Sequence, residues 1–236
     1  MKIKCFWEHN GDNTLLYAID YPGAHTRGEN LGIAKQKMPA EIRSFALWSG
    51  QPCSAKAIDL EIAEEKTSDL AVCDADSDAI FSAEMLSMNE QEYQRLKALC
   101  LRSAADFLRL YRAIPDCECS CLPPRETFYG NRPRTAKEMY EHTKNVNSYY
   151  FGEIGVDCDN DNTIVRCREY GFAKLETQPN FLANATFTGS CGEQWSLKKV
   201  LRRFIWHDRI HAKAMYRMAL KTFATEVLDP FHFMDI

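Results

Sequence analysis

The chain contains 236 residues, of which 45% are hydrophobic and 26% charged, a balance that is typical of folded globular proteins and excludes wholesale disorder. Its length allows one large domain or two small ones. The 29 lysines and arginines and 33 aspartates and glutamates give a net charge of −4, which argues against a general nucleic-acid-binding protein because such proteins carry basic surfaces.

No segment has the pattern of a membrane span or a secretion signal. The longest apolar runs, such as residues 15–19, are far shorter than the roughly 20 residues that a span needs, and a charge at Glu8 interrupts the N-terminal apolar segment. We therefore expect a cytoplasmic protein without membrane association, whose cysteines stay reduced. Cys117, Cys119 and Cys121 do not have the spacing of a zinc knuckle, which leaves reduced loop thiols or a soft-metal or redox role open.

Residues 1–50 predict a small domain of strands followed by a helix. Residues 3–7 and 15–19 are apolar strand candidates separated by turn residues, which favours a hairpin. After Gly28, apolar residues recur at helical spacing, and Pro39 within that pattern predicts a kink or a split in the helix.

The segment between this hairpin and this helix resembles a known family. Residues 21–29 read Tyr-Pro-Gly-Ala-His-Thr-Arg-Gly-Glu, and Ala34 follows in the helix, which is similar to the HicB-like antitoxin domain. The resemblance implies a small, partly open sheet that binds a protein partner, and we recognise no DNA-binding segment beside it. The alternative is a packing or dimerisation module, which would make the protein a homodimer.

Residues 51–86 are expected to complete or link this first domain. Alternating apolar and acidic residues at 58–62 predict a half-buried strand. Three aspartates between residues 73 and 78 match the first positions of an EF-hand loop, but Ala79 replaces its glycine and the closing glutamate is one position short. We therefore expect a solvated acidic loop and no calcium site.

From residue 87 to the C-terminus, apolar residues recur at helical spacing. Ser87 and Glu90 match a capping box that starts a first helix, which ends near Ile114. Ser196 is a candidate N-cap for the last helix, which should stop before Pro230. The later helices are expected at 135–151, 162–175 and 195–228. Residues 87–236 therefore predict an antiparallel four-helix bundle, and the whole chain an α+β protein.

Three histidines fall on apolar helical stripes. His207 and His211 share one face of the last helix, and His142 interrupts a stripe of the second helix that includes Met139, Val146 and Tyr149. A histidine pair at i and i+4 can present two ligands to one ion, and a third ligand would leave an open position, as in catalytic metal sites. The alternative is that each is a satisfied core histidine. Imidazole binds zinc, nickel, iron and copper, of which we expect zinc or nickel.

Two segments of these helices resemble the DinB-like (DinB/YfiT-related) family. Residues 196–212 are similar to the last helix of that family, with its His-x-x-x-His pattern, and residues 139–146 to its second helix. The resemblance implies a four-helix bundle that holds a divalent metal on His142, His207 and His211. It further implies a metal-dependent transferase that uses a low-molecular-weight thiol, or a related hydrolase, acting on a small-molecule substrate.

Other residues and functions stay open at this point. Glu138 and Asp208 are candidates to hold the ligand imidazoles by hydrogen bonds. Asp208 would also be the general base of a zincin-like peptidase, although zincins carry the longer glutamate there. Arg203 and Arg209 are candidates to line an anionic pocket, or are ordinary exposed charges. Whether the protein is an enzyme is also open, because the HicB-like part could bind a partner in a non-catalytic regulatory protein with a structural metal.

Overall fold

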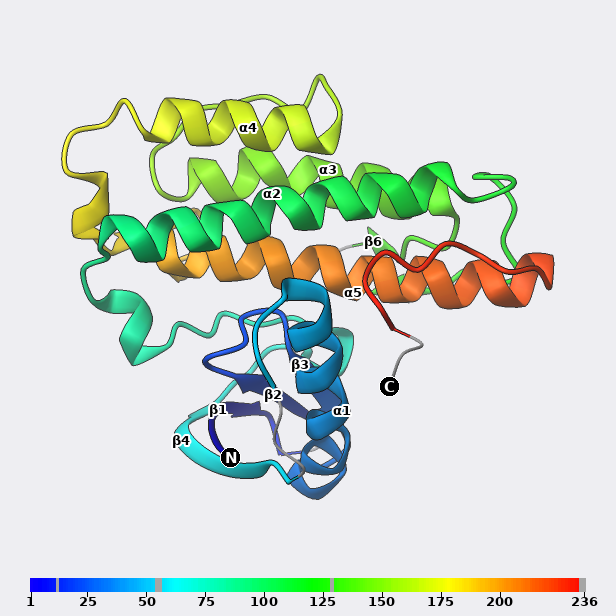
Figure 1. Cartoon of the computed structure of the whole chain (residues 1–236), viewed down its shortest axis with the longest axis horizontal. Helices are drawn as coiled ribbons and strands as arrows, with labels where there is room; N and C mark the ends of the chain where they lie inside the picture. Colours follow the sequence, from blue (N-terminus) through cyan, green and yellow to red (C-terminus); the bar gives the residue numbers. More distant parts are fainter. Residues whose placement is uncertain (12, 54–56, 128–129, 234–236) are drawn as a thin grey trace. The chain divides into compact units, whose positions relative to one another are not determined.

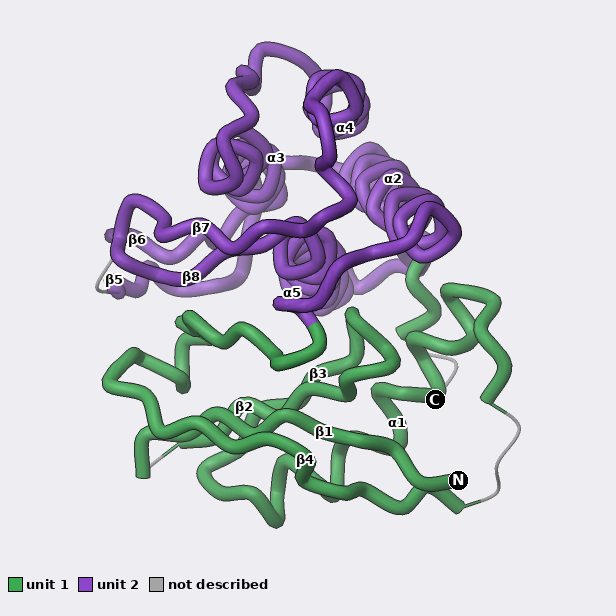
Figure 2. The backbone as a smooth tube through the Cα atoms, turned by 90° about the vertical axis from the view of Figure 1, so that its left-hand side faces the viewer, with its two compact units in different colours: residues 1–83, 231–236 green, residues 84–230 purple. Residues whose placement is uncertain are grey.

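The chain folds into two compact units of mixed α and β structure. The computed structural model describes residues 1–233 except 12, 54–56 and 128–129. The first unit comprises Met1–Ala83 and Phe231–Ile236, and the second Glu84–Pro230 (Figure 2). The described residues form five α-helices, a four-stranded mixed sheet and two small hairpins, which is an α+β fold.

The sheet of the first unit has the strand order β3-β2-β1-β4. Its strands are β1 (Lys2–His9), β2 (Thr14–Ala18), β3 (His25–Gly28) and β4 (Asp59–Thr67). β1 and β2 form the expected antiparallel hairpin, whereas β4 pairs with β1 in parallel. The sequence did not predict β3 or the parallel pairing. Parallel neighbours need a long crossover connection, and the helix that precedes β4 supplies it.

That helix, α1, spans Leu31–Ser49 and continues through Pro39, so it is not split there. Its first turn is capped by Asn30, whose side chain accepts a hydrogen bond from the backbone N–H of Ile33. Gly50 ends the helix with a φ of 72°, which favours glycine. One face of α1 is fully buried within this unit and includes Ala34, Met38, Ile42, Phe45 and Trp48.

A buried carboxyl cluster lies beside this sheet. Glu8 on β1 is fully buried, and its Oε2 accepts a hydrogen bond of 2.5 Å from the Ser77 hydroxyl. Tyr17 donates to Ser77 at 2.9 Å. Asp78 lies against Glu8 and forms an ion pair of 2.6 Å with Lys66. The acidic loop is therefore not fully solvated as predicted, because Ser77 and Asp78 contact a core carboxyl.

Glu8 makes the stability of the first unit depend on pH. Burial raises the pKa of Glu8, so the folded unit holds a proton that the unfolded chain has released above about pH 4.3. This contribution to the free energy of unfolding is complete below that pH and is lost as the pH rises through the raised pKa. The pKa of Asp78, which faces Glu8, is lowered because its pairing with Lys66 outweighs burial, so Asp78 titrates at lower pH.

We expect Glu8→Gln to flatten this dependence between about pH 5 and pH 8, since the amide cannot ionise. Chemical denaturation at both pH values measures the change in the free energy of unfolding. Glu61→Gln is the matched control, because Glu61 is an exposed carboxylate on β4. Equal pH slopes in the wild type and Glu8→Gln would contradict this account of Glu8.

The second unit contains four helices that lie side by side (Figure 1). They are α2 (Glu90–Arg112), α3 (Ala136–Gly152), α4 (Ile164–Leu175) and α5 (Leu197–Phe223). The hydroxyl of Tyr140 near the start of α3 accepts from the first residue of α4, so α3 and α4 run in the same direction. Likewise, Cys100 of α2 donates to Leu201 of α5, two residues in the first halves of their helices.

The predicted antiparallel order is therefore wrong for these two pairs. The connection from Gly152 to Ile164 is long enough to explain the difference. Its eleven residues can extend over roughly 36 Å, which exceeds the length of about 25 Å of the 17-residue α3. The chain can thus return to the starting end of α3 before α4 begins.

The helix starts follow local capping chemistry. The predicted capping box at Ser87 is wrong: α2 starts two residues later, where Asn89 accepts from Glu92. Thr135 and Glu138 form a complete capping box at the start of α3. Ser196 caps α5 as predicted.

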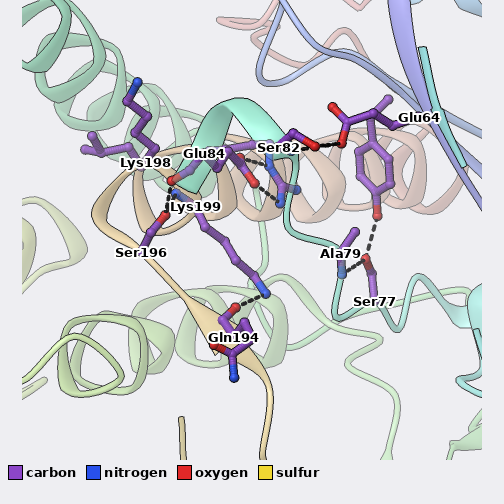
Figure 3. Close-up of polar contacts among 12 residues, drawn as sticks. Glu64, Ser77, Ala79, Ser82, Glu84, Gln194, Ser196, Lys198 and Lys199 are labelled. Carbon is purple, nitrogen blue, oxygen red and sulfur yellow. Dashed lines mark hydrogen bonds and ion pairs between the residues drawn. The ribbon is translucent and has the colours of Figure 1, made fainter. Parts of the chain in front are cut away.

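The start of α5 is also held by buried polar contacts. The Ser196 hydroxyl donates to the carbonyl of Glu84, and the ammonium of the fully buried Lys199 donates to the carbonyl of Gln194 (Figure 3). α5 ends at Phe223, where Ala224 adopts a left-handed φ of 49°, so the helix is shorter than predicted.

Two short hairpins complete the second unit. They pair β5 (Glu126–Thr127) with β6 (Gly130–Asn131), and β7 (Phe187–Thr188) with β8 (Gln194–Trp195). Their strands have two residues each, too few for a periodic signal, and the sequence did not predict them. Among the described residues, no helix has both the length and the apolar character needed to cross a bilayer.

Candidate metal centre

α3 and α5 bring three histidines into one cluster. The ring centroids of His207 and His211 are 4.4 Å apart, and those of His142 lie 5.1 Å and 4.6 Å from them. One nitrogen from each ring lies within 4.8 Å of the others. Within the described part of the chain, this is the one group of three or more His, Cys, Asp or Glu side chains arranged to hold a metal ion.

The cluster lies at the edge of the core. His207 is buried, with 9% of its surface exposed, whereas His142 and His211 are half-buried. The predicted buried face of α3 is wrong. Tyr149, which was expected on that face, is 39% exposed, and the observed buried face includes Asn147 instead. His142 therefore stands at the border between the buried and exposed faces of α3.

Two of the three imidazoles, those of His142 and His207, favour the neutral form that metal binding requires. Burial and the neighbouring imidazoles lower the pKa of His207 well below its usual range, and burial lowers the pKa of His142. The Nδ1 atom of His207 is buried and has no hydrogen-bond partner among the described residues. Leaving such an atom unsatisfied costs about 1–3 kcal/mol, so it marks a position for a ligand.

The donor set fits a divalent transition metal. Imidazole nitrogens bind zinc at about 2.1 Å, so two nitrogens that share one ion lie at most about 4.2 Å apart. The nitrogens of the cluster lie within 4.8 Å of one another, and a small rotation of the side chains closes the difference. Three protein ligands leave coordination positions for water or substrate.

A buried ion pair lies directly beside the cluster. Arg168 of α4 and Asp208 of α5 are both completely buried, and the guanidinium donates to both carboxylate oxygens at 2.5 Å and 3.2 Å. Arg168 also donates to Asn147 of α3 at 3.0 Å and to the carbonyl of Cys100 of α2 at 3.2 Å. This network connects all four helices next to the ligand His207.

The two carboxylates singled out from the sequence are thus engaged in structural contacts. Both oxygens of Asp208 bind Arg168, which does not suit the zincin-like role of a general base at the metal. Oε2 of Glu138 accepts from the backbone N–H groups of Arg134 and Thr135, and these bonds outweigh burial and lower its pKa. Glu138 therefore fixes the start of α3, one turn before His142.

The two arginine candidates, Arg203 and Arg209, differ in their position relative to the cluster. The guanidinium of Arg203 lies 5.5 Å from the ring of Tyr150, which itself contacts His207 edge-on at 6.0 Å. Arg209 is buried, and burial lowers its pKa to about 9 although the charge of Asp229 opposes the shift. Arg203 is therefore the arginine of this pair that belongs to the surroundings of the cluster.

Sequence reasoning missed Arg168, Asn147 and Tyr150. A signal existed for Arg168, because it lies four residues after Ile164 and four before Phe172, both of which are buried. A charge on such a stripe requires a buried partner. Nothing local identifies Asp208 as that partner, since the two are 40 residues apart.

The cysteines at 117, 119 and 121 do not gather into a ligand group within the described residues. Cys117 donates a weak hydrogen bond to the carbonyl of Tyr111, while Cys119 and Cys121 are exposed. All three are free thiols.

Comparisons with known proteins identify no relative. No family model, curated protein or solved structure matches the chain. Function is therefore inferred from the geometry of the histidine cluster.

Proposed function

We propose that Glu84–Pro230 is a DinB-like metal-binding bundle in which His142, His207 and His211 hold a divalent cation, zinc or nickel. The convergence of three imidazoles from two helices carries this proposal. The unsatisfied Nδ1 of the buried His207 supports it independently, because a metal or its bound water would supply the missing partner.

We further propose that the centre is catalytic and acts with a low-molecular-weight thiol, as a transferase or a related hydrolase. A divalent cation would lower the pKa of a bound thiol or water and so provide a nucleophile near neutral pH. The chain itself contributes neutral ligands and, through the half-buried His142 and His211, access from solvent. Tyr150 and Phe204 exclude water on the buried side of His207.

The alternative is a non-catalytic regulatory protein whose HicB-like unit binds a partner. An observation that favours it is β4, a nine-residue strand at the edge of the sheet. Edge strands can accept a strand from a partner, but charged side chains discourage this pairing. β4 carries Asp59, Glu61, Glu64 and Glu65, so only a basic partner strand would suit it.

We expect His207→Ala to abolish stoichiometric metal binding, because it removes the buried histidine of the cluster and leaves two half-buried imidazoles. Elemental analysis of the purified protein, together with titration of the metal-free protein with Zn²⁺, measures the stoichiometry. His9→Ala is the matched control, since His9 lies on β1 in the first unit and is not part of the cluster.

Circular dichroism of both variants establishes that the helices persist. A folded His207→Ala protein that still binds one equivalent of metal would rule out the proposed centre. Loss of metal in both variants would show that the loss is not specific to this cluster and would count against the proposed centre.

A further inference from the structure

Arg203 lies beside the histidine cluster on α5, one helical turn before His207. Residues at i and i+4 on a helix are neighbours, with Cβ atoms about 6 Å apart. Three aromatic rings hold the guanidinium at this position, and its distances to the rings of Trp206, Tyr150 and Trp195 are 4.7, 5.5 and 5.6 Å. Arg203 is half-buried, so it is both fixed in position and accessible from solvent.

Among the described residues, three carboxylates around the cluster and Arg203 are already paired with basic side chains. The three ligands are neutral imidazoles, so a divalent ion would keep its full charge. Two carboxylates adjoin the ligands in the sequence: Asp208 is paired with Arg168, and Glu141 is paired with Lys144 at 2.7 Å. Lys199, one turn before Arg203, is paired with Glu193 at 2.7 Å. Once loaded with metal, the site would contain two positive groups, the ion and Arg203, in a partly desolvated setting. Such a site favours the binding of a negatively charged group.

On the basis of the metal centre proposed above, we propose that the substrate or thiol bound at this centre carries an acid group, and that Arg203 binds it. One end of the small molecule reaches the metal through sulfur or oxygen, and its carboxylate or phosphate reaches the guanidinium. The planar guanidinium suits both acid groups because it can donate two parallel hydrogen bonds. Arg203 thus selects anionic over neutral small molecules.

The test uses the full-length protein loaded with Co²⁺, whose absorption spectrum reports binding of a thiolate. The probes are mercaptopropionate and its neutral counterpart mercaptopropionamide, which present the same thiol. We expect the wild type to bind the acid about tenfold more tightly than the amide, as for a charge-assisted hydrogen bond. Arg203→Gln should abolish this preference and leave the binding of the amide and of Co²⁺ unchanged.

Arg217→Gln is the matched control, because Arg217 is an exposed arginine of the same helix. Arg203→Lys keeps the charge and should retain part of the preference, and it replaces Arg203→Gln if that variant does not fold. Equal affinity of the wild type for acid and amide would overturn the role of Arg203, as would a preference that survives in Arg203→Gln. Failure of the wild type to bind Co²⁺ would instead refute the metal centre itself.

Discussion

Replacing Arg168 with methionine is expected to lower the free energy of unfolding of the second unit by about 3–5 kcal/mol. The substitution removes the guanidinium and leaves the fully buried carboxylate of Asp208 without its partner. It also removes the donors to Asn147 and to the carbonyl of Cys100. Chemical denaturation followed by circular dichroism measures the loss.

Arg166→Met is the matched control, because Arg166 lies on the same helix, is 72% exposed and should change stability by less than about 0.5 kcal/mol. The double variant Arg168→Met with Asp208→Leu removes both charges and should recover much of the loss. Similar stability of the Arg168→Met protein and the wild type would show that this pair does not hold the helices together.

Replacing Phe204 with alanine should cost about 3–5 kcal/mol, because it leaves a cavity at the centre of the second unit. Phe204 is completely buried, and its ring lies 5.3 Å from Tyr150 and 5.1 Å from Phe151. The guanidinium of Arg168 also lies 4.1 Å from the centre of the Phe204 ring, and this cation–π interaction is lost with the ring. Thermal and chemical denaturation measure the effect.

Phe187→Ala provides the comparison, since Phe187 is 39% exposed on a short hairpin and should cost far less. Phe204→Leu keeps most of the volume and should fall between the two. If Phe204→Ala were no more destabilising than Phe187→Ala, the aromatic cluster would not be the core of this unit.

The sequence predicted the helices well where one local signal was sufficient. Thr135 and Ser196 cap α3 and α5 because a hydroxyl beside the first free backbone N–H groups is a local interaction. The start of α2 shows the limit of such signals, since Ser87 and Asn89 are both good caps and the chain uses Asn89. Hydrophobic periodicity does not decide between caps two residues apart.

The buried face of α3 was predicted wrongly for a different reason. Its buried face includes Thr143 and Asn147, which are polar, while the aromatic Tyr149 is exposed. Thr143 is satisfied by donating to the carbonyl of Met139, and Asn147 accepts from Arg168 of another helix. Burial of these groups depends on partners that only the folded chain supplies, so hydropathy assigns them to the wrong face.

The histidine cluster could be proposed because two of its members share a helix face. The spacing of His207 and His211 makes them neighbours in any helix. The approach of His142 depends on how α3 packs against α5, which periodicity does not determine. The direction of α4 and the parallel pairing of β4 with β1 were missed likewise, because each depends on a long connection that returns along the structure.

The position of the histidines along the chain has a mechanical consequence. His142 and His207 are 65 positions apart (207 − 142), and the intervening chain includes all of α4 and the β7–β8 hairpin. A cation shared by the two residues would act as a reversible cross-link that closes this loop. If it constrained the unfolded chain as a covalent bridge does, the lost entropy would correspond to about 4 kcal/mol. Loading with metal would then stabilise the folded second unit against unfolding, and removal of the metal would take that contribution away.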